Sequence, residues 1–277
     1  MDFFDDLTAA IAADGAKRGI RVSPEEWQKF TGRISRPMEE APAPRQEMTP
    51  PPVPVRPAEP TRPARQPMAP PVSMPVTPPV EEAPAFRIPQ ASEIPGDWDG
   101  LRNMALNCRN CALCNARQNV VFGEGAPNAR LMFIGEGPGA DEDATGRPFV
   151  GAAGQLLDKM INAMHLRREE VYIANIVKCR PPGNRMPGED EAAACIGYLH
   201  RQIELIKPEV IVLLGGTALH FLLHIDGISR CRGRWFDFRN IAVMPTFHPA
   251  FLLRKPESKR EAWHDLKLVM AKLGIPV

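Results

Sequence analysis

Apolar runs alternate with amphipathic segments along the C-terminal two-thirds of the chain. Four runs are apolar without in-and-out alternation and are predicted to be strands, at 130–134, 171–177, 210–214 and 241–244. Four segments with apolar residues every three or four positions are predicted to be helices, at 154–161, 187–206, 217–223 and 260–272. Strands of this kind alternating with helices indicate a central, mainly parallel sheet covered on both faces. We therefore predict a three-layer α/β/α domain over 97–277, of the α/β class.

The N-terminal part has a different pattern. Of the 31 prolines, 19 lie between Pro37 and Pro95, and Phe86 is the aromatic residue of that stretch. Such a composition cannot bury enough apolar surface to offset chain entropy, so 37–96 is predicted to be a disordered proline-rich linker. Helical spacing of Leu7 and Ile11 predicts a short helical segment within 1–36. Both regions are candidate binding sites for a protein partner.

Charge and composition narrow the class of protein. The 277 residues carry a net charge of +1, and no run approaches the ~18 apolar residues of a membrane span. We expect a monomeric cytoplasmic protein, where the six cysteines bind metal or react more readily than they form disulfides. Basic residues gather at 230–234 and 254–260, which predicts either phosphate contacts or a solvated surface.

Five of the cysteines are spaced as metal ligands. Cys108, Cys111 and Cys114 follow one another at three-residue intervals, and Cys179 and Cys195 come later. Four thiolates suit either a tetrahedral zinc ion or a 4Fe-4S cluster, and the spacing does not separate them. A simple ferredoxin is disfavoured because no proline follows Cys114. The sixth thiol, Cys231, is interpreted as a free cysteine.

Candidate binding groups fall at the carboxyl ends of the predicted strands, where ligands of such sheets bind. Gly135 opens a glycine-rich loop that runs to Asp143, and Asn175 and His248 follow later strands. The loop does not match the dinucleotide fingerprint G-x-G-x-x-G. Its backbone amides can approach a flat or anionic ligand, and Phe149 can offer a ring to a base.

The segment 135–154 closely resembles motif 1 of the iron-sulfur uracil-DNA glycosylases, family 4 of that superfamily. Three further segments agree with the family, at 175–185, at Cys195 and at 247–254. The resemblance implies a uracil-DNA glycosylase fold and a 4Fe-4S cluster of structural role. The ligands that it implies are Cys108, Cys111, Cys179 and Cys195, with Cys114 as an extra thiol.

The chemistry of such an enzyme assigns roles to the residues of these motifs. Phe149 would stack on the flipped uracil, the Asn175 amide would read O4 and N3–H, and His248 would donate to O2 as the bond breaks. Backbone amides at Glu136 and Gly137 would complete the pocket. In this family Gly137 replaces the water-activating aspartate of other branches, which is consistent with catalysis by leaving-group stabilisation.

Three further side chains receive less defined roles. Glu142 is predicted either to orient the attacking water or to close off the C5 position of the base. Leu252 and Arg254 are predicted to contact DNA, the leucine as an apolar wedge at the vacated base; packing of Leu252 under the last helix is the alternative.

The sequence thus predicts an enzyme that flips uracil out of single- or double-stranded DNA and hydrolyses its N-glycosidic bond, the first step of base-excision repair. Two other hypotheses stay open. One is a glycosylase of the same superfamily that acts on another deaminated base, such as hypoxanthine. The other is a non-enzymatic iron-sulfur DNA-binding or polymerase-associated module tethered by the linker.

Overall fold

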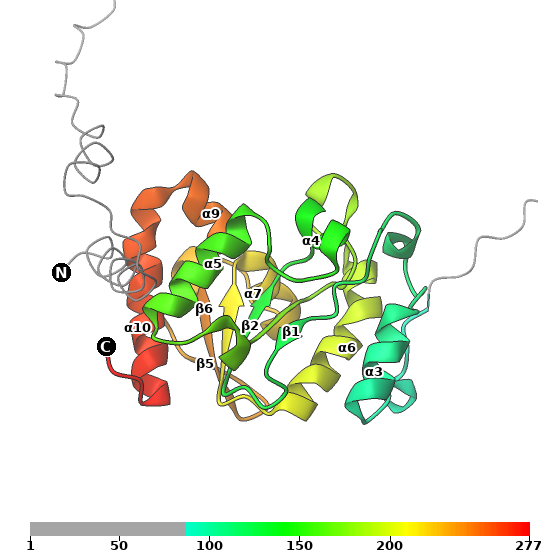
Figure 1. The fold of residues 1–277 in the computed structure, drawn as a ribbon, viewed down its shortest axis with the longest axis horizontal. Helices are drawn as coiled ribbons and strands as arrows, with labels where there is room; N and C mark the ends of the chain where they lie inside the picture. The colour runs from blue at the N-terminus through cyan, green and yellow to red at the C-terminus, as the bar shows by residue number, and fades with distance from the viewer. Residues whose placement is uncertain (1–86) are drawn as a thin grey trace, which may run out of the picture. The chain divides into compact units, whose positions relative to one another are not determined.

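A computed structural model describes residues 87–277 of the chain, shown as the coloured ribbon in Figure 1. The predicted helical segment 1–36 and the linker as far as residue 86 lie outside the described residues. Packing of the domain reaches back to Ile94, which is 5% exposed and lies in the core just after the 3-10 turn η1 (Ala91–Glu93). None of the helices in this part of the chain is long and apolar enough to cross a membrane.

The centre of the domain is a six-stranded sheet in the order β1-β3-β2-β4-β6-β5. The strands are β1 (Glu124–Gly125), β2 (Leu131–Gly135), β3 (Tyr172–Asn175), β4 (Val210–Leu214), β5 (Phe236–Phe238) and β6 (Ile241–Thr246). The four inner strands pair in parallel, and the short edge strands β1 and β5 pair antiparallel. β2, β3 and β4 are buried along their whole length, as strands covered on both faces must be. The predicted α/β class with a mainly parallel sheet is confirmed.

Helices cover both faces of the sheet, as Figure 1 shows. One apolar core lies between the sheet and α5 (Ala152–Ala163) and α10 (Lys259–Leu273). A second core lies between the other face and α3 (Trp98–Leu106), α6 (Glu189–Ile206) and α7 (Gly216–Leu223). The short helices are α4 (Ala140–Thr145), α8 (Ile228–Cys231) and α9 (Pro249–Arg254), and the 3-10 turns besides η1 are η2 (Ala112–Asn115), η3 (Arg168–Glu170), η4 (Pro182–Asn184) and η5 (Pro256–Ser258).

The edge strands β1 and β5 were not predicted, β6 continues to Thr246 instead of residue 244, and β3 stops at Asn175 instead of residue 177. The two residues after Asn175 remain hydrogen-bonded to the end of β2, because the Ile176 N–H donates to the Gly135 carbonyl (3.0 Å) and the Val177 N–H to the Glu136 carbonyl (3.2 Å). The segment after β3 is therefore held against the loop after β2 even though it is no longer a regular strand.

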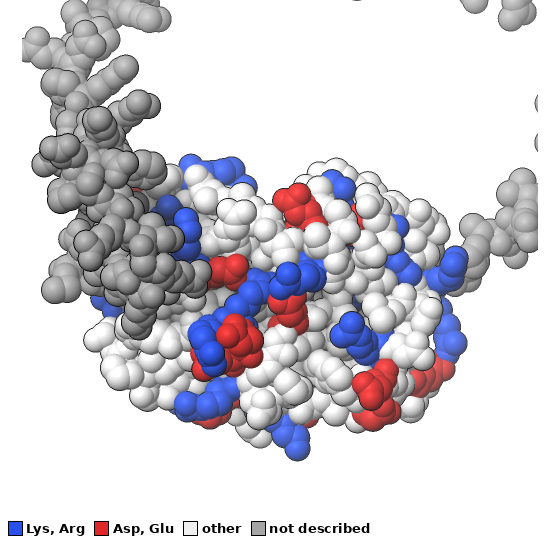
Figure 2. Space-filling view, viewed as in Figure 1, with Lys and Arg blue, Asp and Glu red and all other residues white. Residues whose placement is uncertain are grey.

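Basic and acidic side chains are intermingled on the face of the domain seen in Figure 2. Arg232, from the predicted basic cluster at 230–234, is only 15% exposed along its side chain. Its Nε donates to Asp265 (3.0 Å), a carboxylate with no exposed surface, and Asp265 also accepts from the Thr246 hydroxyl (2.7 Å). Arg232 therefore anchors the end of β6 and is not available to phosphates.

Candidate active site

A cavity of about 460 Å³ lies at the carboxyl ends of β2, β3 and β6. This is the edge at which parallel sheets of this kind bind ligands. The lining residues that the sequence predicted are Glu136, Gly137, Glu142, Phe149, Asn175, His248 and Arg254. The structure thus brings side chains from three strand ends and two loops to one place, although they are up to 118 positions apart in the chain (136 to 254).

The inner end of the cavity is built by two strand ends in register. Gly135 pairs with Asn175 across β2 and β3, and a Cβ added to Gly135 would lie 2.5 Å from both Asn175 Oδ1 and Phe149 Cζ. A side chain at position 135 would thus displace both neighbours. Asn175 is 1% exposed, and its Oδ1 has no hydrogen-bond partner among residues 87–277. Because burial of an unpaired amide oxygen is costly, this atom is an acceptor poised for a ligand.

Phe149 forms one wall of the cavity. Its ring lies 5.6 Å from the imidazole of His248, centroid to centroid, at an interplanar angle of 33°. The residue has φ +49°, in the left-handed region that side chains other than glycine rarely adopt. Space for this backbone is provided by Gly154 in α5, where a Cβ would lie 1.9 Å from the Phe149 carbonyl oxygen.

Gly154→Ala is therefore expected to destabilise the domain by about 1–3 kcal/mol, as overpacking against backbone does. Helix propensity alone would have the opposite effect, an increase of about 1 kcal/mol in the free energy of unfolding. Urea unfolding of the variant tests this expectation. Gly216→Ala is the matched control, since a Cβ there would meet only Ile228 Cβ at 4.0 Å. An increase in the free energy of unfolding for Gly154→Ala would contradict the close approach.

His248 precedes α9 and caps it. Its Nδ1 accepts the Ala250 backbone N–H at 3.1 Å, so Nδ1 is unprotonated and the proton of the neutral ring is on Nε2. Burial, and then the charge of Arg254, lower the pKa of His248 to about 4, with Glu142 partly opposing the shift. At neutral pH the ring is therefore a neutral hydrogen-bond donor at the cavity wall.

Glu142 joins two loops instead of pointing freely into the cavity. Its Oε1 accepts the N–H groups of Val150 (2.9 Å) and Gly151 (3.0 Å), and its Oε2 accepts that of Gly139 (3.0 Å). Most of the acceptor capacity of the carboxylate is thus used by backbone. This geometry fixes the walls of the cavity, while the predicted role of Glu142 toward water or the C5 position stays a prediction.

Glu136 and Gly137 help to fix the position of the glycine-rich loop at the cavity. The Glu136 carboxylate accepts from the Thr217 hydroxyl at 2.5 Å, which ties the loop to the first turn of α7. A Cβ added to Gly137 would lie 2.8 Å from Val177 Cγ2. A catalytic acid at position 137 would therefore require Val177 to move.

The tip after His248 is not a loop but the helix α9. Leu252 has no exposed surface and lies in the core with residues of α10, so the alternative of packing under the last helix holds for it and the wedge role is wrong. Leu253 is the leucine turned outward, with 44% exposed. The helical period of 3.6 residues puts neighbours about 100° apart, which is why two consecutive leucines have opposite environments. Arg254 lines the cavity, and its predicted contact with DNA stays a prediction.

The five predicted cysteines also come together. Cys111, Cys179 and Cys195 are buried, while Cys108 and Cys114 are half-buried. The pKa of Cys111 is raised to about 11, mainly by burial and to a smaller extent by the nearby charges of Cys179 and Cys108, while a hydrogen bond to the backbone of Leu113 partly opposes the shift. The segment 108–114 and the segment 179–195, which are distant in sequence, thus lie close together. Among residues 87–277, no three histidine, cysteine or acidic side chains are arranged to hold one metal ion.

Cationic and amide donors surround these thiols. The Arg117 guanidinium donates to Cys179 Sγ (3.1 Å) and to the Cys108 carbonyl (2.8 Å), which joins the two segments. The Lys178 N–H donates to Cys195 Sγ (3.2 Å). Hydrogen bonds and positive charge at a sulfur favour its thiolate form, the form that binds metal, and here they partly oppose the burial that raises the pKa of Cys179 and Cys195.

Eight lining residues received no individual role in the sequence analysis: Pro138, Gly139, Ala153, Pro181, Asn184, Arg185, Ala250 and Phe251. Pro138 and Gly139 lie in the glycine-rich loop and Asn184 and Arg185 at the end of the segment 175–185, and the signals of the other four differ. Phe251 follows His248 by three positions, a spacing that puts both on one face once α9 is known to be helical. The other three have small or rigid side chains with no chemical signal, so only the folded chain places them at the cavity.

Comparison with known proteins identifies the class to which this α/β domain and its cavity belong. The family model described as the uracil DNA glycosylase superfamily matches residues 122–267. The chain therefore belongs to the uracil DNA glycosylase superfamily.

Several individual relatives are Type-4 uracil-DNA glycosylases. The Type-4 uracil-DNA glycosylase of Thermotoga maritima is 53% identical over 152 residues, which cover 53% of this chain and 78% of the relative. That of Archaeoglobus fulgidus is 42% identical over 180 residues, 62% of this chain and 90% of the relative. A DNA polymerase of Bacillus phage SP01 is 30% identical over 152 residues, 54% of this chain but 16% of the polymerase. The resemblance to family 4 read from the sequence motifs is confirmed.

Proposed function

We propose that this chain is a uracil-DNA glycosylase that removes uracil from DNA and leaves an abasic site. The observation that carries the proposal is the unpartnered Asn175 Oδ1, buried beside an aromatic ring and a neutral histidine. A glycosylase must stack, read and release one flipped base, and these three side chains supply one function each. Base excision is the step that begins repair of deaminated cytosine.

Recognition would use the two ends of the Asn175 amide. Uracil presents a donor at N3 and an acceptor at O4, so Oδ1 would accept N3–H while Nδ2 donates to O4. Cytosine presents the opposite pattern at these two positions and would leave both groups unpaired. Discrimination of this kind is strong, because unpaired buried groups are costly.

Catalysis would rest on stabilising the leaving group. As the bond between N1 and C1′ breaks, its electron pair moves onto the base, and His248 Nε2–H donates a hydrogen bond to O2 while keeping its proton. A water oxygen bonds to C1′ and loses a proton to solvent, and the uracil anion takes up a proton after release. The carboxylates of Glu136 and Glu142 are already bound to Thr217 and to backbone N–H groups, which agrees with a path in which nucleophile activation matters less.

Release of uracil from a labelled oligonucleotide with a single uracil tests the proposal. Purified full-length protein is expected to release the base and leave a site that alkali cleaves. Inosine-containing and undamaged oligonucleotides are run beside it. Faster release of hypoxanthine than of uracil would favour the altered-substrate hypothesis, and binding without release of any base would favour the non-enzymatic one.

We propose further that Cys108, Cys111, Cys179 and Cys195 hold a 4Fe-4S cluster. The donor set fits, since Cys108, Cys111, Cys179 and Cys195 lie near enough to influence one another's charge, and Arg117 and Lys178 offset that charge. Each thiolate of such a cluster binds its own iron, so the sulfurs need not meet at one point. When bound, the cluster would cross-link the two segments and supply no reacting group.

Metal analysis tests this ligand set. Anaerobically purified protein is expected to contain about four iron atoms and four sulfides per chain. Cys179→Ala should lose most of the iron, whereas Cys231→Ala, at a thiol outside the group, should retain it. Equal iron content of the two variants would refute the assignment, and zinc in place of iron would refute the cluster.

Substitutions of the two leucines of α9 are expected to have different effects, one on the stability of the domain and the other on its contact with DNA. Leu252→Ala should lower the free energy of unfolding by about 2–5 kcal/mol, as loss of a buried leucine does. Leu253→Ala should change it by less than about 0.5 kcal/mol, yet slow uracil release from duplex more than from single-stranded DNA. Only in a duplex does the flipped base leave a gap that an exposed side chain can fill. Equal slowing on both substrates would exclude Leu253 as the wedge.

A further inference from the structure

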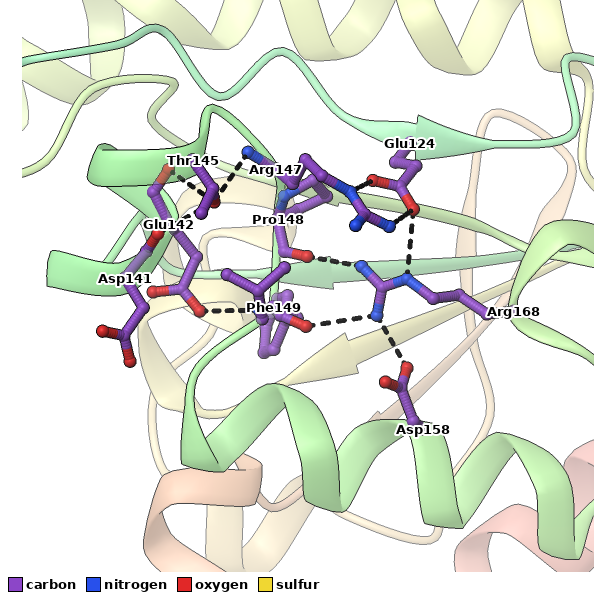
Figure 3. A network of polar contacts seen from close by, with 10 residues as sticks. Glu124, Asp141, Glu142, Thr145, Arg147, Pro148, Phe149, Asp158 and Arg168 are labelled. Carbon is purple, nitrogen blue, oxygen red and sulfur yellow. Dashed lines mark hydrogen bonds and ion pairs between the residues drawn. The ribbon is translucent and has the colours of Figure 1, made fainter.

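We propose that Arg168 is a positioning residue that holds Phe149 in its base-stacking pose, an inference that rests on the proposed function. Arg168 begins the 3-10 turn η3, and its side chain is 18% exposed. Its Nη2 donates to the Pro148 carbonyl (2.5 Å) and its Nη1 to the Phe149 carbonyl (3.1 Å), as Figure 3 shows. One planar guanidinium thus binds two consecutive carbonyl groups, a geometry for which its fixed fork of donors is suited.

An opposite charge binds the next two residues of the same segment. The carboxylate of Glu142 accepts the N–H groups of Val150 and Gly151. The segment 148–151 is therefore held through its carbonyls by a cation and through its amides by an anion. Figure 3 shows the two side chains on either side of it. Charge-assisted hydrogen bonds are about twice as strong as neutral ones, so this frame is rigid.

The frame is needed because of the Phe149 backbone. A φ of +49° is disfavoured for a residue with a side chain, and such conformations persist only where the surroundings enforce them. Without Arg168, the Pro148 and Phe149 carbonyls lose the donors that orient them. The ring would then leave its place against His248 and Gly135, which is where it could stack on a base.

Two carboxylates fix the orientation of Arg168 itself. Its Nη1 contacts Asp158 Oδ1 in α5 at 2.7 Å, and its Nε contacts Glu124 Oε1 in β1 at 3.2 Å. Glu124 also binds Arg147 through two bonds of 2.7 Å. Hydrogen bonds from Arg147, and then from Arg168, hold the pKa of Glu124 below its usual value, so it remains an anion. Arg147 is 59% exposed and lies outside the carbonyl frame, which makes it a matched control.

A double-mutant cycle tests whether Arg168 acts through Phe149. The single-turnover rate of uracil release is measured for Arg168→Gln, Phe149→Ala and the double variant. Arg168→Gln is expected to slow release about 10- to 100-fold when Phe149 is present, as displacement of a positioned group does. In the Phe149→Ala background the same change should cost less than about twofold, because no ring remains to be positioned. Arg147→Gln should cost less than about threefold.

Equal losses in both backgrounds, or full activity of Arg168→Gln, would overturn the proposal. Asp158→Asn serves as a second variant if Arg168→Gln folds poorly, since it frees the guanidinium without touching the carbonyls. It should show the same dependence on Phe149 with a smaller loss.

Amide hydrogen exchange of peptides covering 148–154 gives a readout independent of activity. Arg168→Gln is expected to speed exchange there and to leave α10 unchanged. If wild-type protein releases no uracil, the proposed function fails, and this measurement still decides whether Arg168 holds the segment. Unchanged exchange at 148–154 would refute the positioning role in either case.

Discussion

Asn175→Ala is expected to slow uracil release about a thousandfold, roughly 4 kcal/mol of transition-state stabilisation. The side chain that it removes would make two hydrogen bonds to the base, and its oxygen has no other partner among the described residues. Its place is fixed by the register of β3 on β2, so no neighbouring side chain can replace it. Single-turnover kinetics with a single-uracil oligonucleotide measure the loss.

The stability of the same variant distinguishes a binding group from a structural one. Because Oδ1 is buried without a partner, its removal should leave the free energy of unfolding within about 1 kcal/mol of the wild-type value. Asn184→Ala is the matched control, since Asn184 also lines the cavity but accepts a bond from Arg180 (2.7 Å). A loss of less than tenfold for Asn175→Ala would show that this amide does not read the base.

His248→Ala is expected to slow release by about 10²–10³-fold, the cost of removing one preorganised donor from a developing anion. The Ala250 N–H bound to Nδ1 sets the tautomer that makes Nε2 the donor. His248→Gln, which keeps an N–H donor, should retain more activity than His248→Ala. His220→Ala should change little, because His220 pairs with Asp226 and Glu189 away from the cavity.

The pH dependence of release follows from the low pKa of His248, about 4. The neutral ring is the active form, so the rate should show no loss from this group between pH 8 and about 5, whereas a histidine of ordinary pKa, about 6.5, would lose activity across that range. Stability should fall as pH drops from about 6.5 to about 4, because the unfolded chain binds the proton before the folded one does. A rate that halves near pH 6.5 in wild type but not in His248→Gln would contradict the assignment.

The sequence predicted the inner sheet well because its strands carry the strongest signal. The strand at 210–214 was predicted at the bounds that the structure gives, since a run of five apolar residues admits little else. β1 and β5 were missed because strands of two and three residues at a sheet edge leave too short a pattern. The choice between a wedge and core packing for Leu252 was left open for the same reason, because a helix of six residues leaves too short a pattern to show which leucine is buried.

Residues at the site could be predicted when a polar side chain stood out in the sequence, and could not when only the folded structure brings them to the site. Asn175 and His248 follow apolar strands and stand out as polar groups at strand ends. Arg168 could not be predicted in this way, because it binds the Phe149 carbonyl from 19 positions further along the chain and no local sequence pattern indicates such a contact. Thr217, which ties Glu136 to α7, is hidden for the same reason.

The absence of space at Gly135 limits how this cavity can be redesigned. Its inner end is main chain and two side chains already in contact, so a larger base cannot be admitted there by substitution. Ala153 and Phe251 line the cavity with side chains that take no part in the hydrogen bonds to the site. A mutant library intended to broaden the range of excised bases should therefore vary these two positions and keep the strand ends as they are.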